Sequence, residues 1–242
     1  MAEDGSSGGV GTLSEKAMHK ALKLYIEPDA SRHEQPLAGY VADIINEGGV
    51  TEVQTGDLAI LAPKLRAFLE IGPVTVVRPV AVEWRIRWVD PDTAEITPSS
   101  RTVRSNRIYS LGRGLCKLWD ILLRPDFTLV ILTLSLDEYK IRRDKVKRGQ
   151  KRRIERIPRE LIDEIRLCRR EDYLIFLPDS LGDEFTMAEY LKAIRSRSRY
   201  DQYSLHLLCR LGLVERRQQR RKYVYNRIPL QYGKTVVEEV TQ

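Results

Sequence analysis

The sequence lacks any segment that would carry the chain into or across a membrane. Its longest apolar run, residues 127–136, is only about ten residues long and contains Thr and Ser, whereas a spanning helix needs about 20 apolar residues. That run predicts a buried strand. Residues 1–12 are rich in Gly and Ser and show no basic segment followed by an apolar one, so we expect a flexible leader and not a secretory signal. We therefore expect a cytoplasmic protein with no membrane partner.

The sequence also lacks the motifs of several enzyme classes. Its three cysteines, Cys116, Cys168 and Cys209, are far apart and odd in number, which gives neither a disulfide framework nor a zinc site. Neither a Gly-x-x-x-x-Gly-Lys-Ser/Thr loop nor a Gly-x-Ser-x-Gly elbow occurs. Nucleotide hydrolysis through a P-loop and serine-hydrolase chemistry therefore find little support.

What the sequence has is a division of charge. The 242 residues are 42% hydrophobic, enough for one large or two modest domains with real cores. The net charge of +7 hides two unlike parts: residues 1–139 carry 15 Lys/Arg against 19 Asp/Glu, and residues 140–242 carry 26 against 15. A positive part attached to a slightly acidic one favours nucleic-acid binding, because cationic side chains displace counterions from phosphates.

Residues 40–55 predict a β-hairpin with one carboxylate in each strand. Two runs rich in β-branched residues flank the turn sequence Asn46-Glu47-Gly48-Gly49, whose residues suit tight turns. The expected register pairs Asn46 with Gly49, Ile45 with Val50, and Asp43 with Glu52. Like charges opposite one another destabilise a sheet, so we expect a divalent cation to bind both carboxylates. The alternatives are a surface hairpin facing water, or an odd loop that separates the carboxylates onto two faces.

The hairpin is expected between two helices. Residues 12–25 predict a helix in which Glu15 either forms a capping box with Thr12 or delivers a carboxylate to the site; His19, one turn later, is interpreted as a packing residue. Residues 57–70 predict a second helix with an apolar face, followed by a strand over residues 74–82.

The next segments complete an expected mixed α/β layer structure. The sequences WRIRWV and AEIT predict a second hairpin around Asp90-Pro91-Asp92-Thr93, whose aspartates we assign to the turn and not to a metal. Residues 107–123 predict a helix before the buried strand at 127–136, and this first domain is expected to cover residues 13–139. Residues 140–180 predict a basic linker, either a solvated loop or a phosphate-contacting arm, and a helix led by Ile157-Pro158.

Residues 181–242 show a helix, a turn, a second helix and a basic hairpin. The first helix spans residues 185–194 with Thr186 as N-cap, the second spans 199–211, and two strands flank residues 218–221. The pattern resembles a winged helix-turn-helix domain, in which the second helix enters the major groove and the wing contacts backbone; a winged helix that binds only protein is the alternative. The resemblance implies two sets of DNA-binding residues, the groove-facing Arg197, Arg199, Tyr200, Gln202 and Tyr203, and the phosphate-contacting Arg216, Arg217, Arg220, Arg221 and Lys222.

The first domain resembles the PD-(D/E)xK nuclease superfamily. The resemblance rests on the helix with Glu15, the strand with Asp43, the strand bearing Glu52-Val53-Gln54, and the helix and strand that follow. It implies that Asp43 and Glu52 bind Mg²⁺ or Mn²⁺ with help from Glu15. Ala42 stands where the superfamily usually has proline, and Gln54 stands where it usually has lysine. Lys16 or Lys64 is a candidate to supply the missing charge.

These observations lead to one leading hypothesis and one alternative. We expect an α/β protein, a restriction-endonuclease-like mixed sheet flanked by helices plus a small C-terminal winged-helix domain, that acts as a metal-dependent DNA endonuclease. Its catalytic residues would be Glu15, Asp43, Glu52 and Gln54, with Gln54 orienting the attacking water. A homodimer would supply two sites for double-strand cutting. The alternative is a non-enzymatic DNA-binding regulator or an inactive nuclease-like scaffold, which Gln54 favours.

Overall fold

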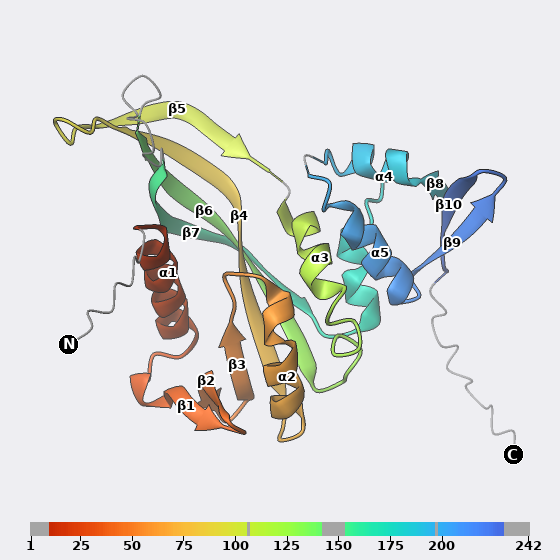
Figure 1. Ribbon diagram of the computed structural model, residues 1–242, viewed down its shortest axis with the longest axis horizontal. Helices are drawn as coiled ribbons and strands as arrows, with labels where there is room; N and C mark the ends of the chain where they lie inside the picture. The colour runs from red at the N-terminus through yellow and green to blue at the C-terminus, as the bar shows by residue number, and fades with distance from the viewer. Residues whose placement is uncertain (1–9, 106, 142–152, 197, 230–242) are drawn as a thin grey trace, which may run out of the picture.

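The computed structural model describes residues 10–105, 107–141, 153–196 and 198–229, and it shows an α/β protein with a large mixed sheet flanked by helices (Figure 1). Six strands follow one another across the large sheet, and β5 pairs with the far part of β4. The order across the sheet is β1 (His33–Leu37), β2 (Tyr40–Asn46), β3 (Gly49–Val53), β4 (Val74–Val89), β6 (Phe127–Ile141) and β7 (Arg153–Leu167), with β5 spanning Ile96–Arg104.

The strand pairing changes from antiparallel to parallel between β3 and β4. Strands β1, β2 and β3 form an antiparallel meander, whereas β4 runs parallel to both β3 and β6. A parallel neighbour requires a crossover connection, and the chain supplies it with the short 3-10 helix η2 (Leu58–Leu61) and the helix α2 (Ala62–Leu69). The segment expected as a helix at 57–70 is therefore confirmed.

Helices cover both faces of the large sheet. Leu22 of α1 (Val10–Ile26) packs in one cluster with Val53 and Val77, while Leu65 of α2 packs in another with Val76. Neighbouring residues such as Val76 and Val77 point to opposite faces of a strand, so α1 and α2 lie on opposite sides (Figure 1). In the described part of the chain, no helix has the length and apolar character needed to cross a membrane.

Both predicted hairpins are present. The first pairs Asn46 with Gly49 and Ile45 with Val50, which confirms the expected register at these positions. The second joins β4 to β5, and β4 continues to Val89 instead of ending at residue 82. The side chain of Asp90 accepts a hydrogen bond from the backbone N–H of Asp92 at 3.0 Å, as expected of a turn residue.

The helix expected at residues 107–123 is wrong in its length. The chain forms the 3-10 helix η3 (Arg107–Leu111) and a single turn of α-helix, α3 (Gly112–Leu115), before further turns. Glycine weakens helices, and here it permits close contact: a Cβ on Gly112 would lie 2.2 Å from the backbone nitrogen of Ser204. Packing against another helix therefore sets the local structure.

The helix expected from Ile157-Pro158 is also wrong, because these residues belong to β7. That strand pairs antiparallel with the buried strand β6 along its length and forms the edge of the sheet. Proline is tolerated on an edge strand, and the register shifts beside the pair Leu136–Pro158. The large sheet thus continues to Leu167, past Tyr139, and the basic residues 142–152 lie outside the described residues.

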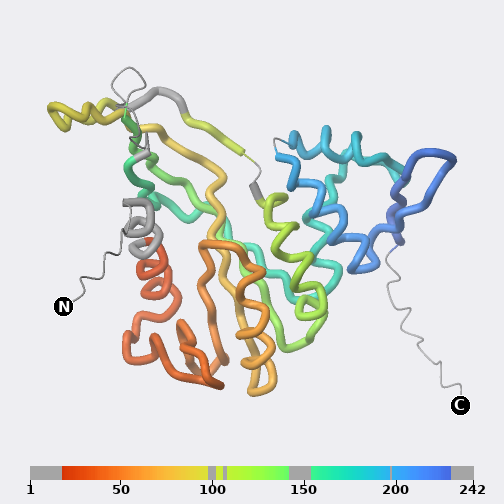
Figure 2. Tube along the Cα trace, viewed as in Figure 1, coloured from red at the N-terminus to blue at the C-terminus, as the bar shows by residue number. Residues whose placement is uncertain are grey.

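The C-terminal part contains two helices and a small sheet. After η5 (Arg170–Phe176), the helices α4 (Met187–Ala193) and α5 (Gln202–Arg210) pack beside a sheet in the order β8 (Glu184–Thr186), β10 (Lys222–Arg227), β9 (Val214–Gln219). Thr186 caps α4 in a capping box with Glu189, as expected. Leu205 and Leu208 of α5 share one core cluster with Leu115, so this part packs directly onto the α3 side of the large sheet (Figure 2).

Candidate functional site

Asp43 and Glu52 lie where the first hairpin stops pairing as a regular ladder. The last paired residues are Ile44 and Thr51. Beyond them, the N–H of Asp43 donates to Glu52 Oε1 at 3.0 Å, and the N–H of Val53 donates to Asp43 Oδ2 at 2.8 Å. Each carboxylate therefore accepts a backbone hydrogen bond from the opposite strand, and the two acidic residues stay beside one another.

Helix α1 brings a histidine to Asp43. His19 Nε2 lies 3.1 Å from Asp43 Oδ2, and the Asp43 side chain is only 13% exposed. Burial acts to raise the pKa of Asp43, but the hydrogen bonds from His19 and the Val53 N–H outweigh it and lower the pKa. The same hydrogen bond raises the pKa of His19. His19 is therefore a hydrogen-bonding partner of Asp43. The sequence-based interpretation of His19 as a packing residue did not include this role.

Helix α2 brings a lysine to Glu52. Lys64 Nζ donates to Glu52 Oε2 at 2.5 Å, and the Glu52 side chain is 2% exposed. Burial raises the pKa of Glu52 in spite of this lysine, and the nearby negative charge of Asp43 adds to the rise. We call His19, Asp43, Glu52 and Lys64 the carboxylate site.

The other two expected catalytic residues, Gln54 and Glu15, are not among these four residues. The Gln54 side-chain amide donates to the backbone carbonyl of Asp57 at 2.9 Å, and the Gln54 backbone carbonyl accepts from Arg78 Nη1 at 2.6 Å. Gln54 therefore braces the loop between β3 and η2. Glu15 lies in α1 one turn before His19, but its side chain and that of Lys16 are outside the described part.

The carboxylate site offers oxygen donors to a hard cation. No group of three or more His, Cys, Asp and Glu side chains that could hold a metal is found among the described side chains, which do not include Glu15. Asp43 and Glu52 supply two carboxylates, the ligand type that Mg²⁺ and Mn²⁺ prefer. Burial is the main cause of the raised pKa of Glu52, and the hydrogen bond from Lys64 acts against the rise. These two carboxylates are the donors that would face such an ion, and each already contacts a side chain of the protein, His19 or Lys64.

The groove-facing residues expected in the second C-terminal helix are partly covered. Arg199 is exposed, Tyr200, Gln202 and Tyr203 are half-buried, and Arg197 lies outside the described residues. The cover comes from α3: the guanidinium carbon of Arg113 lies 4.7 Å from the centre of the Tyr200 ring. This contact between segments far apart in the sequence had no local signal.

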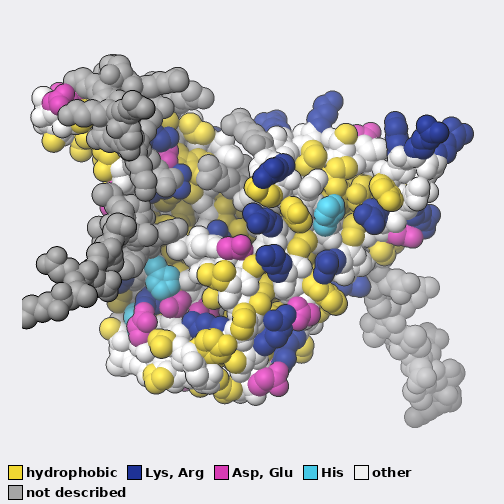
Figure 3. All heavy atoms as spheres, in the orientation of Figure 1, with side chains coloured by type: hydrophobic (Ala, Val, Ile, Leu, Met, Phe, Trp, Pro, Cys, Tyr) yellow, Lys and Arg dark blue, Asp and Glu magenta, His cyan; other side chains and the backbone are white. Residues whose placement is uncertain are grey.

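The hairpin between β9 and β10 carries the expected phosphate-contacting residues, all of them exposed. Arg217 forms an ion pair with Glu215 at 2.7 Å, and Arg216 lies over the Tyr223 ring at 4.7 Å. Figure 3 shows Lys and Arg side chains gathered over α3, α5 and this hairpin. The five residues are Arg216, Arg217, Arg220, Arg221 and Lys222.

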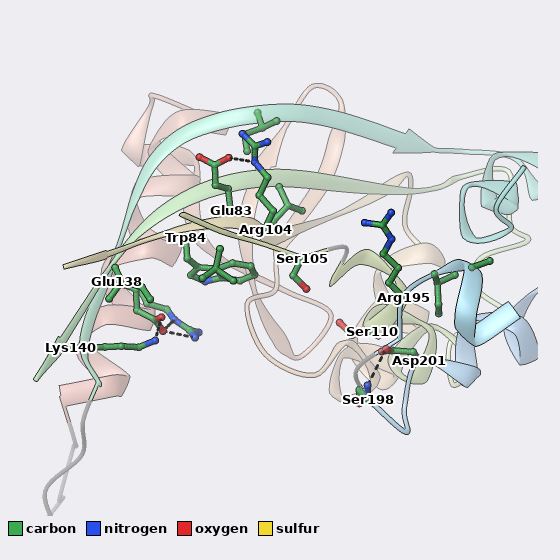
Figure 4. A pocket seen from close by; sticks show the side chains of 17 residues that line it. Glu83, Trp84, Arg104, Ser105, Ser110, Glu138, Lys140, Arg195, Ser198 and Asp201 are labelled. Atoms are coloured by element: carbon green, nitrogen blue, oxygen red, sulfur yellow. Dashed lines mark hydrogen bonds and ion pairs between the residues drawn. The ribbon is translucent and has the colours of Figure 1, made fainter. Parts of the chain in front are cut away.

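A separate polar cleft of about 1120 Å³ lies between the long strands β4 to β7 and the turn that joins α4 to α5 (Figure 4). Its charges are largely paired. Glu138 accepts hydrogen bonds from Arg156 Nη2 at 2.9 Å and forms an ion pair with Lys140 at 2.5 Å. Glu83 accepts from Arg104 Nε at 2.9 Å. Since its lining residues come from distant parts of the chain, sequence patterns gave no sign of it.

A match to a family of known sequences spans the residues of the large sheet. A family model described as "Domain of unknown function (DUF8091)" matches residues 16–168, a range that ends at the end of β7. An "Uncharacterized protein" of Treponema pallidum (strain Nichols) is 30% identical over 133 residues, which are 54% of this chain and 53% of the relative. The chain thus matches about half the length of that curated relative. No solved structure matches the chain.

Proposed function

The chain belongs to the DUF8091 family, and we propose that it is a metal-dependent DNA endonuclease that hydrolyses phosphodiester bonds at the carboxylate site. The observation that carries this proposal is the buried pair of Glu52 and Lys64 beside Asp43, with Lys64 Nζ 2.5 Å from Glu52 Oε2. Two adjacent carboxylates can hold a metal ion that polarises a phosphate and activates water, and Lys64 adds a positive charge beside them.

The order of elements supports the proposal. Helix α1 is followed by three antiparallel strands, by α2, and by β4 parallel to β3. Asp43 lies in the second of these strands and Glu52 near the end of the third. Apart from the additional strand β1, this is the order of elements on which the resemblance to the PD-(D/E)xK superfamily rests. We therefore propose a restriction-endonuclease-like fold in which Lys64, from α2, supplies the charge that Gln54 lacks.

Each residue of the site has a role in this proposal. Asp43 and Glu52 would hold Mg²⁺ or Mn²⁺, with Glu15 of α1 as a further ligand. The bound ion would polarise the scissile phosphate and lower the pKa of a water molecule. Lys64 would stabilise negative charge that develops on the phosphate, and His19 would keep the Asp43 carboxylate ionised and oriented. Gln54, held to the Asp57 carbonyl, would position the strand end that carries Glu52.

The C-terminal part would dock the DNA. We propose that α4, α5 and the β9–β10 hairpin form a winged helix-turn-helix domain, with the start of α5 in the major groove and the hairpin on phosphates. DNA as a substrate is consistent with a cytoplasmic location. Two copies of the chain would be needed to cut both strands at one position.

A specific observation favours the alternative, a non-enzymatic DNA-binding regulator or inactive nuclease-like scaffold. Asp43 already contacts His19, Glu52 already contacts the Lys64 ammonium group, and the Gln54 amide is engaged with the backbone. A protein of this kind would bind DNA in a salt-dependent manner without cutting it.

Incubation of the purified chain with supercoiled plasmid and Mg²⁺ or Mn²⁺ tests the proposal. We expect cleavage that requires the ion and is lost in Asp43→Asn and in Glu52→Gln. The matched control is Asp126→Asn, which removes a carboxylate paired with Arg124 away from the site and should leave the rate unchanged. DNA binding without cleavage under either ion, together with metal affinity that Asp43→Asn and Glu52→Gln leave unaltered, would select the alternative.

A further inference from the structure

Helix α3 lies in the part of the chain that the family model matches, residues 16–168, which we call the family domain. Its backbone touches the backbone of helix α5 in the C-terminal part. A Cβ added to Gly112 would lie 2.2 Å from the Ser204 nitrogen, so the two helices meet where only glycine fits. The thiol of Cys116 donates a hydrogen bond to the Tyr203 carbonyl, with Sγ and O 3.2 Å apart. The start of α5 is therefore held rigidly against α3.

Cationic side chains rest on aromatic rings across this junction. Two guanidinium groups lie near the Tyr200 ring, with Arg113 at 4.7 Å and Arg199 at 5.0 Å from its centre. Arg210 lies 5.9 Å from the centre of the Trp119 ring, and Trp119 is 40% exposed. Such contacts stabilise a cation in place without neutralising it. We call the set the cation–aromatic surface; it comprises Arg113, Lys117, Trp119, Arg199, Tyr200 and Arg210.

The positive charge of this surface is uncompensated. Arg113, Lys117, Arg199 and Arg210 are all exposed, and none forms an ion pair with a carboxylate of the described residues. The nearby Asp120 is engaged by Arg66, with Nη2 and Oδ2 3.0 Å apart. Figure 3 shows Lys and Arg side chains over α3, α5 and the β9–β10 hairpin on the same face of the molecule. A surface of this charge fits a polyanion, and arginine held in a fixed plane suits phosphate.

The position of α3 beside α5 indicates which part of a polyanion it would meet. Packed helices lie about 8–10 Å apart, and the major groove of DNA is about 12 Å wide. An element packed against a helix in the groove therefore falls on the sugar–phosphate strand that borders the groove. We propose that the cation–aromatic surface binds the phosphate backbone of duplex DNA beside α5, so that the family domain itself takes part in docking. This inference rests on the proposed function.

The same surface leads toward the carboxylate site. A Cβ on Gly114 of α3 would lie 3.1 Å from the Leu58 Cβ of η2, and η2 continues into α2, which carries Lys64. Duplex DNA held on α3 is thus held beside the elements that build the site. The surface connects docking by the C-terminal part to hydrolysis by the large sheet.

Binding of a fluorescein-labelled duplex, measured by anisotropy over a series of salt concentrations, tests this proposal. The double variant Arg113→Ala/Lys117→Ala should weaken binding about tenfold or more and reduce the slope of log K against log salt by about 2, one unit for each lost phosphate contact. The matched control Arg32→Ala/Arg166→Ala also removes two charges, but both pair with carboxylates elsewhere, Arg32 with Glu47 and Arg166 with Glu164. Its slope should equal that of the wild type.

Three results would overturn the proposal. If Arg113→Ala/Lys117→Ala keeps the wild-type slope while Arg220→Ala/Arg221→Ala weakens binding, the C-terminal part docks DNA alone and the proposed function stands. If polyglutamate competes as well as duplex DNA of equal charge, the surface recognises an acidic protein. If the wild-type chain binds no duplex, the proposed function and this inference both fail. The residues substituted in these two double variants are all exposed, so thermal unfolding of these variants should match that of the wild type. That result would exclude misfolding as the cause of weaker binding.

Discussion

At the scale of single residues, the Glu52–Lys64 pair is a buried ion pair between the large sheet and α2. A carboxylate that is 2% exposed keeps a raised pKa although an ammonium group touches it. Burial of ion pairs seldom stabilises a protein, and local violations of folding rules are expected at functional sites. The pair is therefore the feature on which the proposed function rests.

A double-mutant cycle measures the contribution of this pair to stability. Lys64→Met should lower the free energy of unfolding by about 2 kcal/mol, because it leaves Glu52 buried beside Asp43 without its cation. Glu52→Gln/Lys64→Met should recover most of this loss, since no buried charge then remains unpaired. Urea denaturation provides the values. A double variant no more stable than Lys64→Met would contradict the account.

The pH dependence of stability can be tested at Glu138, which lies in the polar cleft and away from the carboxylate site. Burial acts to raise its pKa, but hydrogen bonds from Lys140 and Arg156 outweigh burial and lower the pKa below the ordinary value of 4.5. A carboxyl with a lowered pKa stabilises the fold above its unfolded pKa and loses that contribution as the pH falls through the folded pKa.

The wild type should therefore be more stable than Glu138→Gln at neutral pH, and the difference should shrink as the pH falls below the ordinary pKa of 4.5. Urea unfolding of both proteins at several pH values gives the comparison. Parallel pH profiles for the two proteins would show that the Glu138 pKa is not lowered by folding.

The sequence predicted residues of the site where one local element sufficed. Turn chemistry set the register that places Asp43 beside Glu52, because both strands flank one turn. The partners His19 and Lys64 come from helices on opposite faces of the sheet, and no local pattern links them to the carboxylates. Lys64 was only one of two candidates for the missing charge, and His19 was interpreted as packing.

At the scale of elements, local pattern and tertiary packing agreed for most of the chain and disagreed most clearly over two expected helices. Helix α1, the two hairpins, α2, β6, α4 and α5 were expected from periodicity and capping. Residues 153–167 alternate apolar and charged side chains loosely enough to suggest a helix, but pairing with the buried β6 makes them a strand. Packing of Gly112 against Ser204 shortens the helix expected at 107–123.

The contact at Gly112 gives a prediction at this scale. Gly112→Ala should lower the free energy of unfolding by about 2–3 kcal/mol, because the added Cβ forces α3 and α5 apart. Gly72→Ala is the control, since nothing lies within 4 Å of a Cβ there, and its effect should stay within about 0.5 kcal/mol. Equal effects in thermal unfolding would contradict the close contact of the two helices.

At the scale of the whole molecule, the boundary between the acidic and basic parts of the sequence does not coincide with the end of the large sheet. The sequence divides into a part with an excess of acidic residues and a strongly basic part near residue 140, whereas the large sheet and the family match extend to residues 167 and 168. A single core cluster contains residues of α2, α3 and α5. Composition predicted two parts of unlike charge, whereas packing joins them through one hydrophobic core.

This arrangement has a consequence for catalysis. DNA held by the hairpin, α5 and the cation–aromatic surface would lie on the face formed by α3 and η2, next to the helix that carries Lys64. We therefore expect docking and hydrolysis to be separable by mutation. Substitutions in the carboxylate site should abolish cleavage without weakening DNA binding, and substitutions in the hairpin should weaken both.

The most direct test of the central claim is the rate of plasmid cleavage in Mg²⁺ by the wild type and by Lys64→Gln. If Lys64 stabilises the transition-state charge, its loss should reduce the rate by about 100-fold or more while duplex affinity stays unchanged. A wild-type chain that cuts nothing with Mg²⁺ or Mn²⁺, or a Lys64→Gln variant that cuts as fast as the wild type, would contradict the account.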